Sequence, residues 1–288
     1  GIITAVYAVT AFIGLGDTDA PQSFHDFRSG ESVTVDLGEV RSIDGIMLYS
    51  GLNTGSYRIE LSDDGNNFSD AGSFEQNYVA LFKWNDFELD ASQELSARYI
   101  RLTASGDVRL GELAVRSGGE LFGQSSDAPE LFDEQGTVPE YQSYLNSTYF
   151  DEIYHARTAY ENIEGVYPYE ISHPPLGKLI IAIGIELFGM TPFGWRFSGV
   201  LFGVLMLPVL YALLKRMFGS TDICACATAI FAFDFMHFSQ TRLATIDTYA
   251  VFFILLMYLF MYMYITGGRK RDLSLIHISE PTRHLRIS

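Results

Sequence analysis

Cysteine is scarce in this 288-residue sequence, which contains only Cys224 and Cys226. Both lie in one apolar run, and two positions apart on a helix their side chains point in different directions. This spacing argues against a disulfide bond between them and against a shared metal site. We expect both to be buried apolar side chains without a chemical role.

Basic residues are also few, with 19 Lys and Arg against 35 Asp and Glu and a net charge of -16. The shortage is concentrated between residues 16 and 172, a stretch that contains 9 basic and 29 acidic residues. Binding to nucleic-acid phosphates needs a basic surface. The composition therefore excludes a nucleic-acid partner for this part of the chain.

Charged residues become rare after residue 175, where the longest apolar runs lie. This contrast predicts about two domains, a soluble module joined to a membrane module. Residues 1–15 are also apolar, but as a helix they would rise only about 22 Å, less than the roughly 30 Å core of a bilayer. We interpret them as the end of a transmembrane helix whose start is missing, because neither a basic segment nor a small-residue cleavage pattern indicates a signal peptide.

Apolar and polar residues alternate with a period of two in several short stretches between residues 30 and 117. Turn residues separate these stretches, and Asp64-Gly65 is typical of a tight turn. Short strands with frequent turns predict an antiparallel β-sandwich. The clearest alternation involves Val33, Val35 and Leu37, then Tyr57, Ile59 and Leu61, then Ile100 and Leu102.

The same region contains the ordered segments VTVDLGEV, IDGIMLYSG, YRIELSDDGNNF, ARYIRLTA and GELAV. In this order they resemble a discoidin-like domain, also called a galactose-binding-like or coagulation-factor type C domain. The resemblance implies a jelly-roll sandwich that could bind a glycan or a lipid surface through loops at one end. The alternative is a spacer without a ligand. Asp17 and Asp19 could suggest calcium, although solvated acids are the simpler interpretation.

Residues 118–148 have little periodicity and contain Gly118-Gly119, which predicts a linker over the domain surface. Residues 149–192 are expected to form a loop outside the membrane with two interfacial helices. The first runs from Phe150 to Ile163. The second, from Leu176 to Phe188, is too short to cross a bilayer.

Residues 193–266 are apolar enough for three transmembrane helices, from about Phe193 to Leu214, Thr221 to Phe238 and Leu243 to Ile265. Basic residues gather on the cytoplasmic side of membrane proteins. This rule places Lys215, Arg216 and the basic residues 269–271 in the cytoplasm. The sandwich and the loop of residues 149–192 then lie outside it, in a multi-pass protein of the cell membrane. Residues 273–288 depart abruptly from the preceding pattern, and we interpret them as a foreign tail.

The residues whose side chains could take part in catalysis gather around this loop. Asp151 and Glu152 lie one helical turn from His155, and His173 precedes two prolines that stiffen the backbone. Sugar transfer from a lipid phosphate to a hydroxyl needs a base for the hydroxyl proton and cations for the phosphate. Either acid is a candidate base. The candidate cations at the same expected depth are Arg196 and Arg242, and Asp247 lies near them.

Each of these residues also has a simpler interpretation. An acid pair can stabilise a helix N-terminus, and an arginine at a membrane edge can extend toward water without any further role. The residues alone therefore leave both interpretations open.

Four motifs follow one another between residues 148 and 266: FDEIYHARTAYE, HPPLGK, FGMTPFGWRF and DFMHFSQTRLATIDTYAVFF. In this order they resemble the N-terminal part of the protein O-mannosyltransferase family. These proteins are integral-membrane glycosyltransferases of the C type that use a polyprenyl- or dolichyl-phosphate sugar. The resemblance implies inverting transfer of mannose to Ser/Thr hydroxyls of exported proteins.

The resemblance also implies roles for individual residues. Asp151 would be the catalytic base, Glu152 its neighbour that binds acceptor or donor, and Arg196 a contact of the donor phosphate. Further donor or substrate contacts would come from His155, His173, Arg242 and Asp247. Some relatives use a divalent metal ion, although the sequence has no ligand spacing that demands one.

One feature departs from the family's usual layout, in which the acid pair follows the first span after a short connector. Here about 130 residues, including the sandwich, intervene. Such an insertion is tolerable because the entropy of loop closure grows slowly with length. We therefore expect a multi-domain fold, with a discoidin-like jelly roll inserted in an extracytoplasmic loop of a truncated α-helical glycosyltransferase C-type domain.

Three alternatives remain open from the sequence. The enzyme could transfer another sugar to a cell-envelope glycan or lipid. The chain could instead be a non-enzymatic, membrane-anchored protein whose sandwich binds carbohydrate. A transporter has less support, since the spans have no visible repeats and no paired helices broken by Gly or Pro.

Overall fold

The computed structural model describes residues 1–89, 95–125, 127–267 and 270–278. The chain forms two compact units. The sandwich unit comprises Asp19–Thr148. The helical unit combines Gly1–Thr18 with the chain from Tyr149 onward, so its two segments flank the sandwich unit in the sequence.

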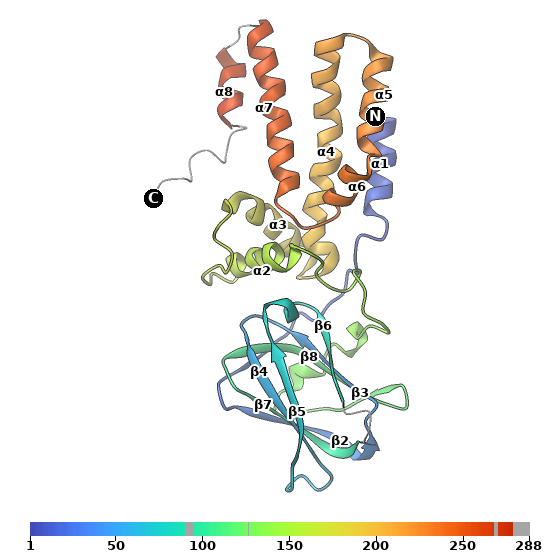
Figure 1. Cartoon of the computed structure of the whole chain (residues 1–288), viewed down its shortest axis with the longest axis vertical. Coiled ribbons are helices and arrows are strands. Elements are labelled where there is room, and N and C mark those ends of the chain that lie inside the picture. The colour runs from blue at the N-terminus through green and yellow to red at the C-terminus, as the bar shows by residue number, and fades with distance from the viewer. Residues whose placement is uncertain (90–94, 126, 268–269, 279–288) are drawn as a thin grey trace. The chain divides into compact units, whose positions relative to one another are not determined.

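The sandwich unit consists of two β-sheets (Figure 1). One has the strand order β1-β8-β3-β6, with β9 paired to β8, and the other has the order β2-β7-β4-β5. Neighbouring strands are antiparallel in both sheets, which confirms the predicted antiparallel β-sandwich. The strands are β1 His25–Phe27, β2 Ser32–Ser42, β3 Gly45–Ser50, β4 Gly55–Ser62, β5 Ser69–Gln76, β6 Trp84–Phe87, β7 Ser96–Ala104, β8 Val108–Ser117 and β9 Glu120–Phe122.

Alternate residues of both sheets form the core between them. The period-two pattern that predicted the strands therefore has a physical cause, because successive side chains of a strand point to opposite faces. Burying each Val, Leu or Ile side chain contributes about 1.5–3 kcal/mol. Buried members include Val33, Val35 and Leu37 of β2, Tyr57, Ile59 and Leu61 of β4, and Ile100 and Leu102 of β7.

The segment after β8 differs from the expected surface linker. It contains β9 and two short 3₁₀ helices, Pro129–Leu131 and Gln135–Thr137. Ala128 and Leu131 are completely buried in the sandwich core. Their contribution was not evident from the sequence, because two apolar residues in a Gly- and Pro-containing segment produce no periodic pattern.

The helical unit contains eight helices in its described part. Two of them, α4 and α7, are long and apolar enough to cross a membrane, and the bent pair α5 and α6 could provide a third span. The helices are α1 Ile2–Phe12, α2 Glu152–Ile163, α3 Pro175–Phe188, α4 Pro192–Phe218, α5 Thr221–Ala232, α6 Phe235–Thr241, α7 Asp247–Gly267 and α8 Lys270–Ile278. Residues 273–278 of the proposed foreign tail continue α8, and residues 279–288 lie outside the described residues.

The expected second span is not straight, since α5 and α6 meet at an angle of 57°. Asp234 lies at this break, and its carboxylate accepts hydrogen bonds from the backbone N–H groups of Met236 and His237. Such N-capping starts a new helix. The apolar composition predicted a single span from Thr221 to Phe238, whereas the local effect of Asp234 divides the segment into two helices.

Small residues allow close packing around α4. A side chain at Gly194 would collide with the carbonyl of Gly189, and one at Gly203 would collide with Thr241 of α6. Tyr7 of α1 is completely buried and hydrogen-bonds Thr241 at 2.7 Å. The short helices α1 and α6 therefore pack directly on the long helix α4.

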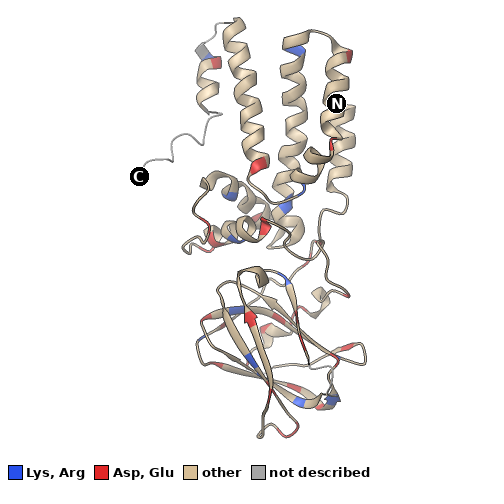
Figure 2. Cartoon of the chain, viewed as in Figure 1, with Lys and Arg blue, Asp and Glu red and all other residues tan. Residues whose placement is uncertain are grey.

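Charged residues of the long helices lie near their ends (Figure 2). Between Arg196 and Lys215, α4 carries no charged residue, and Asp247 is the single charged residue of α7. The Tyr262 hydroxyl near the end of α7 donates to the Arg216 carbonyl near the end of α4 at 3.1 Å. The ends of these two helices thus lie together, and both helices run in the same direction.

The two cysteines correct one expectation. Cys224 is buried, as expected, whereas Cys226 is exposed on the surface of α5. The prediction of two buried thiols was wrong for Cys226, because residues two apart on a helix cannot both face the same neighbour.

Candidate active site

Asp151 lies at the N-terminal boundary of α2. Its backbone carbonyl accepts hydrogen bonds from the N–H groups of Tyr154 and His155 at 3.0 and 3.1 Å. Its side chain makes no capping hydrogen bond and is partly exposed. The capping alternative considered for the acid pair therefore does not describe the Asp151 carboxylate in this structure.

The residue before it, Phe150, has a left-handed backbone conformation with φ of 55°. Such a conformation is unusual for a bulky side chain and costs on the order of 1–3 kcal/mol. The Phe150 side chain is largely exposed, so its own packing does not compensate for this cost. Strain of this kind occurs more often at functional sites than elsewhere.

Glu152 has a different environment from its neighbour. Its side chain is completely buried and forms a two-point ion pair with Arg196 of α4, which is 1% exposed. The Arg196 Nε and Nη2 atoms donate to the two carboxylate oxygens at 2.7 and 2.6 Å. This parallel geometry makes strong charge-assisted hydrogen bonds.

The pair also connects four segments of the helical unit. The Glu152 carboxylate accepts the backbone N–H groups of Tyr149 at 2.8 Å and Ala244 at 2.9 Å. Arg196 Nη1 donates to the Leu15 carbonyl at 2.9 Å. The pair therefore joins the segment after α1, the start of α2, the beginning of α4 and the loop before α7.

His155 and His173 lie close together. Their rings meet edge to face, with centroids 5.6 Å apart. His155 is buried and burial lowers its pKa, which favours the neutral imidazole near pH 7. The side chain of His173 is 52% exposed. The structure thus brings together one buried and one accessible imidazole.

Arg242 and Asp247 have other surroundings. The Arg242 guanidinium donates to the carbonyls of Ala11, Ile13 and Gly14 at 2.6, 2.9 and 2.6 Å. A cation at the C-terminal end of a helix interacts favourably with the helix dipole, so Arg242 stabilises the end of α1. Asp247 is exposed at the first turn of α7.

Two charged residues near His155 and His173 were not predicted from the sequence to be site residues. Glu170 and Lys178 form an ion pair in which the Lys178 side chain is 2% exposed. A lysine in the first turn of a largely apolar helix is unusual and could have drawn attention to this pair. Its partner could not be identified without the structure, because Glu170 belongs to an irregular segment.

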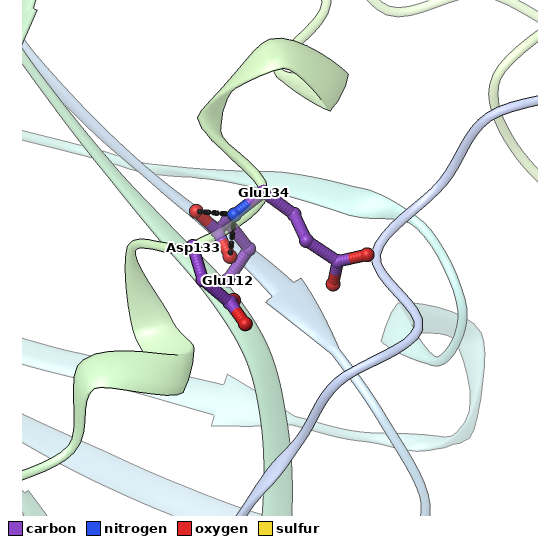
Figure 3. A group of neighbouring side chains, drawn as sticks. All are labelled: Glu112, Asp133 and Glu134. Carbon is purple, nitrogen blue, oxygen red and sulfur yellow. Dashed lines mark hydrogen bonds between the residues drawn. The ribbon is translucent and has the colours of Figure 1, made fainter.

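Among the described residues, one group of acids has oxygen atoms close enough together to bind a metal ion. It lies in the sandwich unit and consists of Glu112, Asp133 and Glu134, whose oxygens lie within 4.8 Å of one another. Figure 3 shows the Glu112 carboxylate with dashed hydrogen bonds to the Glu134 backbone. Gln135 Nε2 donates to the same carboxylate at 2.6 Å. Protein donors thus already satisfy Glu112, and the cluster gives no independent indication of a metal.

Glu112 predicts a pH dependence of stability in the sandwich unit. Burial raises the pKa of its carboxyl from 4.5 to about 7, against the opposing effect of the hydrogen bond from Gln135. Between these values the unfolded chain loses this proton while the folded unit keeps it. Stability should therefore fall by up to about 3 kcal/mol as pH rises from 4.5 to 7, and then level off.

This expectation can be measured by urea unfolding of residues 19–148, which contain their own core. Glu112→Gln should remove most of the decrease between pH 4.5 and 7. Glu120→Gln, at an exposed position of β9, is the matched control and should leave it in place. Equal slopes for the wild type and Glu112→Gln would show that Glu112 is not the responsible group.

Two family models match different parts of the chain. Residues 172–279 match the family model of dolichyl-phosphate-mannose-protein mannosyltransferase. Residues 10–114 match the F5/8 type C domain model. Both resemblances indicated by the sequence motifs are thereby confirmed. The mannosyltransferase match includes His173, Arg196, Arg242 and Asp247, and it begins after the acid pair.

Curated relatives have the same family description. A polyprenol-phosphate-mannose–protein mannosyltransferase of Mycobacterium tuberculosis is 36% identical over 111 residues, covering 36% of this chain and 21% of the relative. One of Corynebacterium glutamicum is 36% identical over 84 residues, covering 29% of this chain and 16% of the relative. The chain therefore spans about a fifth or less of the length of these mannosyltransferases.

A solved structure with similarity to the chain is CpGH89CBM32-6 produced by Clostridium perfringens. Its sequence is 24% identical, and the similarity covers 36% of this chain and 83% of that structure with a TM-score of 0.30.

Proposed function

We propose that this chain is part of a multi-pass membrane mannosyltransferase. The enzyme would move mannose from a polyprenyl-phosphate donor to Ser/Thr hydroxyls of exported proteins. The observation that carries the proposal is the contrast within the acid pair. Asp151 is partly exposed and makes no capping hydrogen bond, while Glu152 is buried in an ion pair. The family match of the adjoining residues supports this assignment.

In the proposed reaction, the Asp151 carboxylate takes the proton of the acceptor hydroxyl. The hydroxyl oxygen attacks the anomeric carbon of the sugar from the face opposite the phosphate. The bond between this carbon and the phosphate oxygen breaks, and polyprenyl phosphate leaves with the electron pair. The product has inverted configuration, and the base retains the proton until solvent removes it.

Phosphate contacts by Arg196 and Arg242 remain part of the proposal. Both guanidinium groups already bind oxygens of the protein, in Glu152 and at the end of α1. A direct contact with phosphate would require these hydrogen bonds to rearrange. The carboxylate of Glu152 neutralises Arg196, whereas the partners of Arg242 are uncharged carbonyl groups, so Arg242 keeps a positive charge that can attract a phosphate. Donor or substrate contacts of His155, His173 and Asp247 also remain proposals.

The arrangement of the helical unit supports the proposed topology. Glu152 accepts a hydrogen bond from Ala244 just before α7, so the acid pair lies near the first turns of α4 and α7. Lys215 and Arg216 lie at the opposite end of α4. If these basic residues face the cytoplasm, the acid pair lies on the other side of the membrane. We propose that the sandwich, which joins the helical unit at residues 18 and 149, is inserted on that same side.

The test uses membranes that contain the full-length parent protein. Radiolabelled polyprenyl-phosphate mannose is supplied with a Ser/Thr-rich peptide, and β-elimination releases sugar bound to hydroxyl groups for analysis. Labelled peptide supports protein mannosylation. Label in a lipid or glycan instead would indicate the alternative transferase. The absence of transfer from several polyprenyl-phosphate sugars, combined with glycan binding by the sandwich, would favour the non-enzymatic alternative.

A further inference from the structure

Lys178 is a buried cation in the first turn of α3. Its side chain is 2% exposed and contacts the Glu170 carboxylate. The ammonium group also donates to the backbone carbonyls of Glu170 and His173, the latter at 3.3 Å. A buried charge is costly unless it is paired and hydrogen-bonded. Lys178 meets both conditions through one short segment of the chain.

Glu170 organises the same segment from the other side. Its Oε1 atom accepts the backbone N–H groups of Ser172 at 2.8 Å and His173 at 3.2 Å. The same oxygen lies 3.1 Å from Nδ1 of His173. Burial opposes ionisation, but hydrogen bonds from Lys178, Ser172 and His173 lower the pKa of Glu170 to about 2. The Glu170 carboxylate therefore stays charged at physiological pH.

This segment is also attached to α2. Glu161 accepts the backbone N–H of Tyr169 at 2.6 Å, and the Thr158 hydroxyl accepts that of Glu170 at 3.2 Å. Arg157 donates to Glu161 at 2.7 Å and thereby orients it. The position of the segment is thus defined relative to the helix that begins beside Asp151.

The result is a defined position for His173. Its accessible imidazole lies against the buried ring of His155. His155 in turn lies one helical turn after Asp151. The charged and titratable groups that act on His155 are Glu170, His173, Lys178 and Asp151. Nδ1 of His155 is buried without a protein hydrogen-bond partner among the described residues. Leaving a buried polar atom without a partner costs about 1–3 kcal/mol.

We propose that Lys178 and Glu170 are positioning residues, which hold His173 beside His155 to hydrogen-bond a hydroxyl group of a substrate. This inference rests on the proposed transferase function. The hydroxyl can belong to the Ser/Thr acceptor or to the sugar of the donor. Lys178 and Glu170 do not contact it themselves and act through His173.

The experiment measures kcat and KM for donor and acceptor separately, in membranes containing the full-length parent. The variants are Lys178→Met, Glu170→Gln, His173→Ala and the double variant Lys178→Met with His173→Ala. Glu186→Gln, at an exposed position of the same helix, is the matched control. Glu170→Gln retains a side-chain oxygen acceptor, so it tests the proposal if Lys178→Met fails to fold.

We expect Lys178→Met and Glu170→Gln each to raise one KM by about tenfold with a smaller change in kcat. A raised acceptor KM identifies the acceptor hydroxyl, and a raised donor KM identifies the sugar. The double variant should be no worse than His173→Ala, because residues that act through a shared group are not additive.

The proposal would be overturned if the losses of Lys178→Met and His173→Ala added up in the double variant. A lower protein level with unchanged KM in the folded protein would also overturn it. Either result would leave the pair a purely structural role. Wild-type rates in both single variants would overturn it as well. Failure of the transferase function is distinguishable, because the wild type would then show no transfer before any variant is compared.

Discussion

Asp151→Asn is expected to lower the rate of mannosyl transfer by about 10²- to 10⁴-fold, the usual contribution of a general base. Asparagine has nearly the same shape as aspartate but cannot take the acceptor proton. The variant should fold normally, because the Asp151 side chain makes no capping hydrogen bond and is partly exposed. The measurement is single-turnover transfer in membranes, normalised to the amount of folded protein.

The control for this variant is Glu164→Gln, which neutralises an exposed acid at the other end of α2. It should transfer mannose within about twofold of the wild type, since a surface substitution away from the site rarely has a large effect. Transfer by Asp151→Asn at the control rate would remove Asp151 from the role of base. A loss of transfer in Glu152→Gln would not then identify Glu152 as the base, unless the variant is also shown to fold.

Glu152→Ala is expected to destabilise the helical unit by about 3–5 kcal/mol, because it leaves the buried Arg196 without its partner. The backbone N–H groups of Tyr149 and Ala244 would lose their acceptor as well. Since proteins are stable by only about 5–15 kcal/mol, this is a large share of the total, and the yield of folded variant should fall clearly below that of the wild type. The measurement is the amount of monodisperse protein after detergent extraction and its midpoint of thermal unfolding.

A double variant tests whether the loss of stability in Glu152→Ala comes from the broken ion pair with Arg196 or from any substitution in this region. Glu152→Leu with Arg196→Met removes both charges and should recover more than half of the stability lost in Glu152→Ala. Replacing both members of a buried ion pair with apolar residues is often neutral or stabilising. Normal yield of Glu152→Ala would contradict the structural role. No recovery in the double variant would show that the hydrogen bonds to Tyr149 and Ala244 matter more than the charge.

The two variants together predict different consequences for adjacent acids. Asp151→Asn should lose rate and keep its stability, whereas Glu152→Ala should lose stability. The motif itself does not distinguish these roles, because Asp151 and Glu152 are chemically alike and occupy neighbouring positions. Their difference comes from helix geometry, which directs consecutive side chains about 100° apart, so that only Glu152 faces α4.

Much of the fold was predictable from local pattern. Alternation in segments such as Val33–Leu37 indicates a half-buried strand, because the period of a strand is a property of the backbone. Long apolar runs likewise predicted α4 and α7. The bend at Asp234 and the burial of Ala128 and Leu131 were not predicted, since neither changes the average composition of its segment.

The sequence by itself determined the candidate chemistry of this protein: an acid pair, two histidines and two arginines beside apolar segments. Only the tertiary structure decided which of them bind one another. Arg196 lies 44 residues from Glu152 in the chain and binds it with two hydrogen bonds. Glu170 and Lys178 acquire their role through the folding of an irregular segment. Ion pairs depend on distances of a few ångströms in space, and sequence separation does not specify such distances between elements.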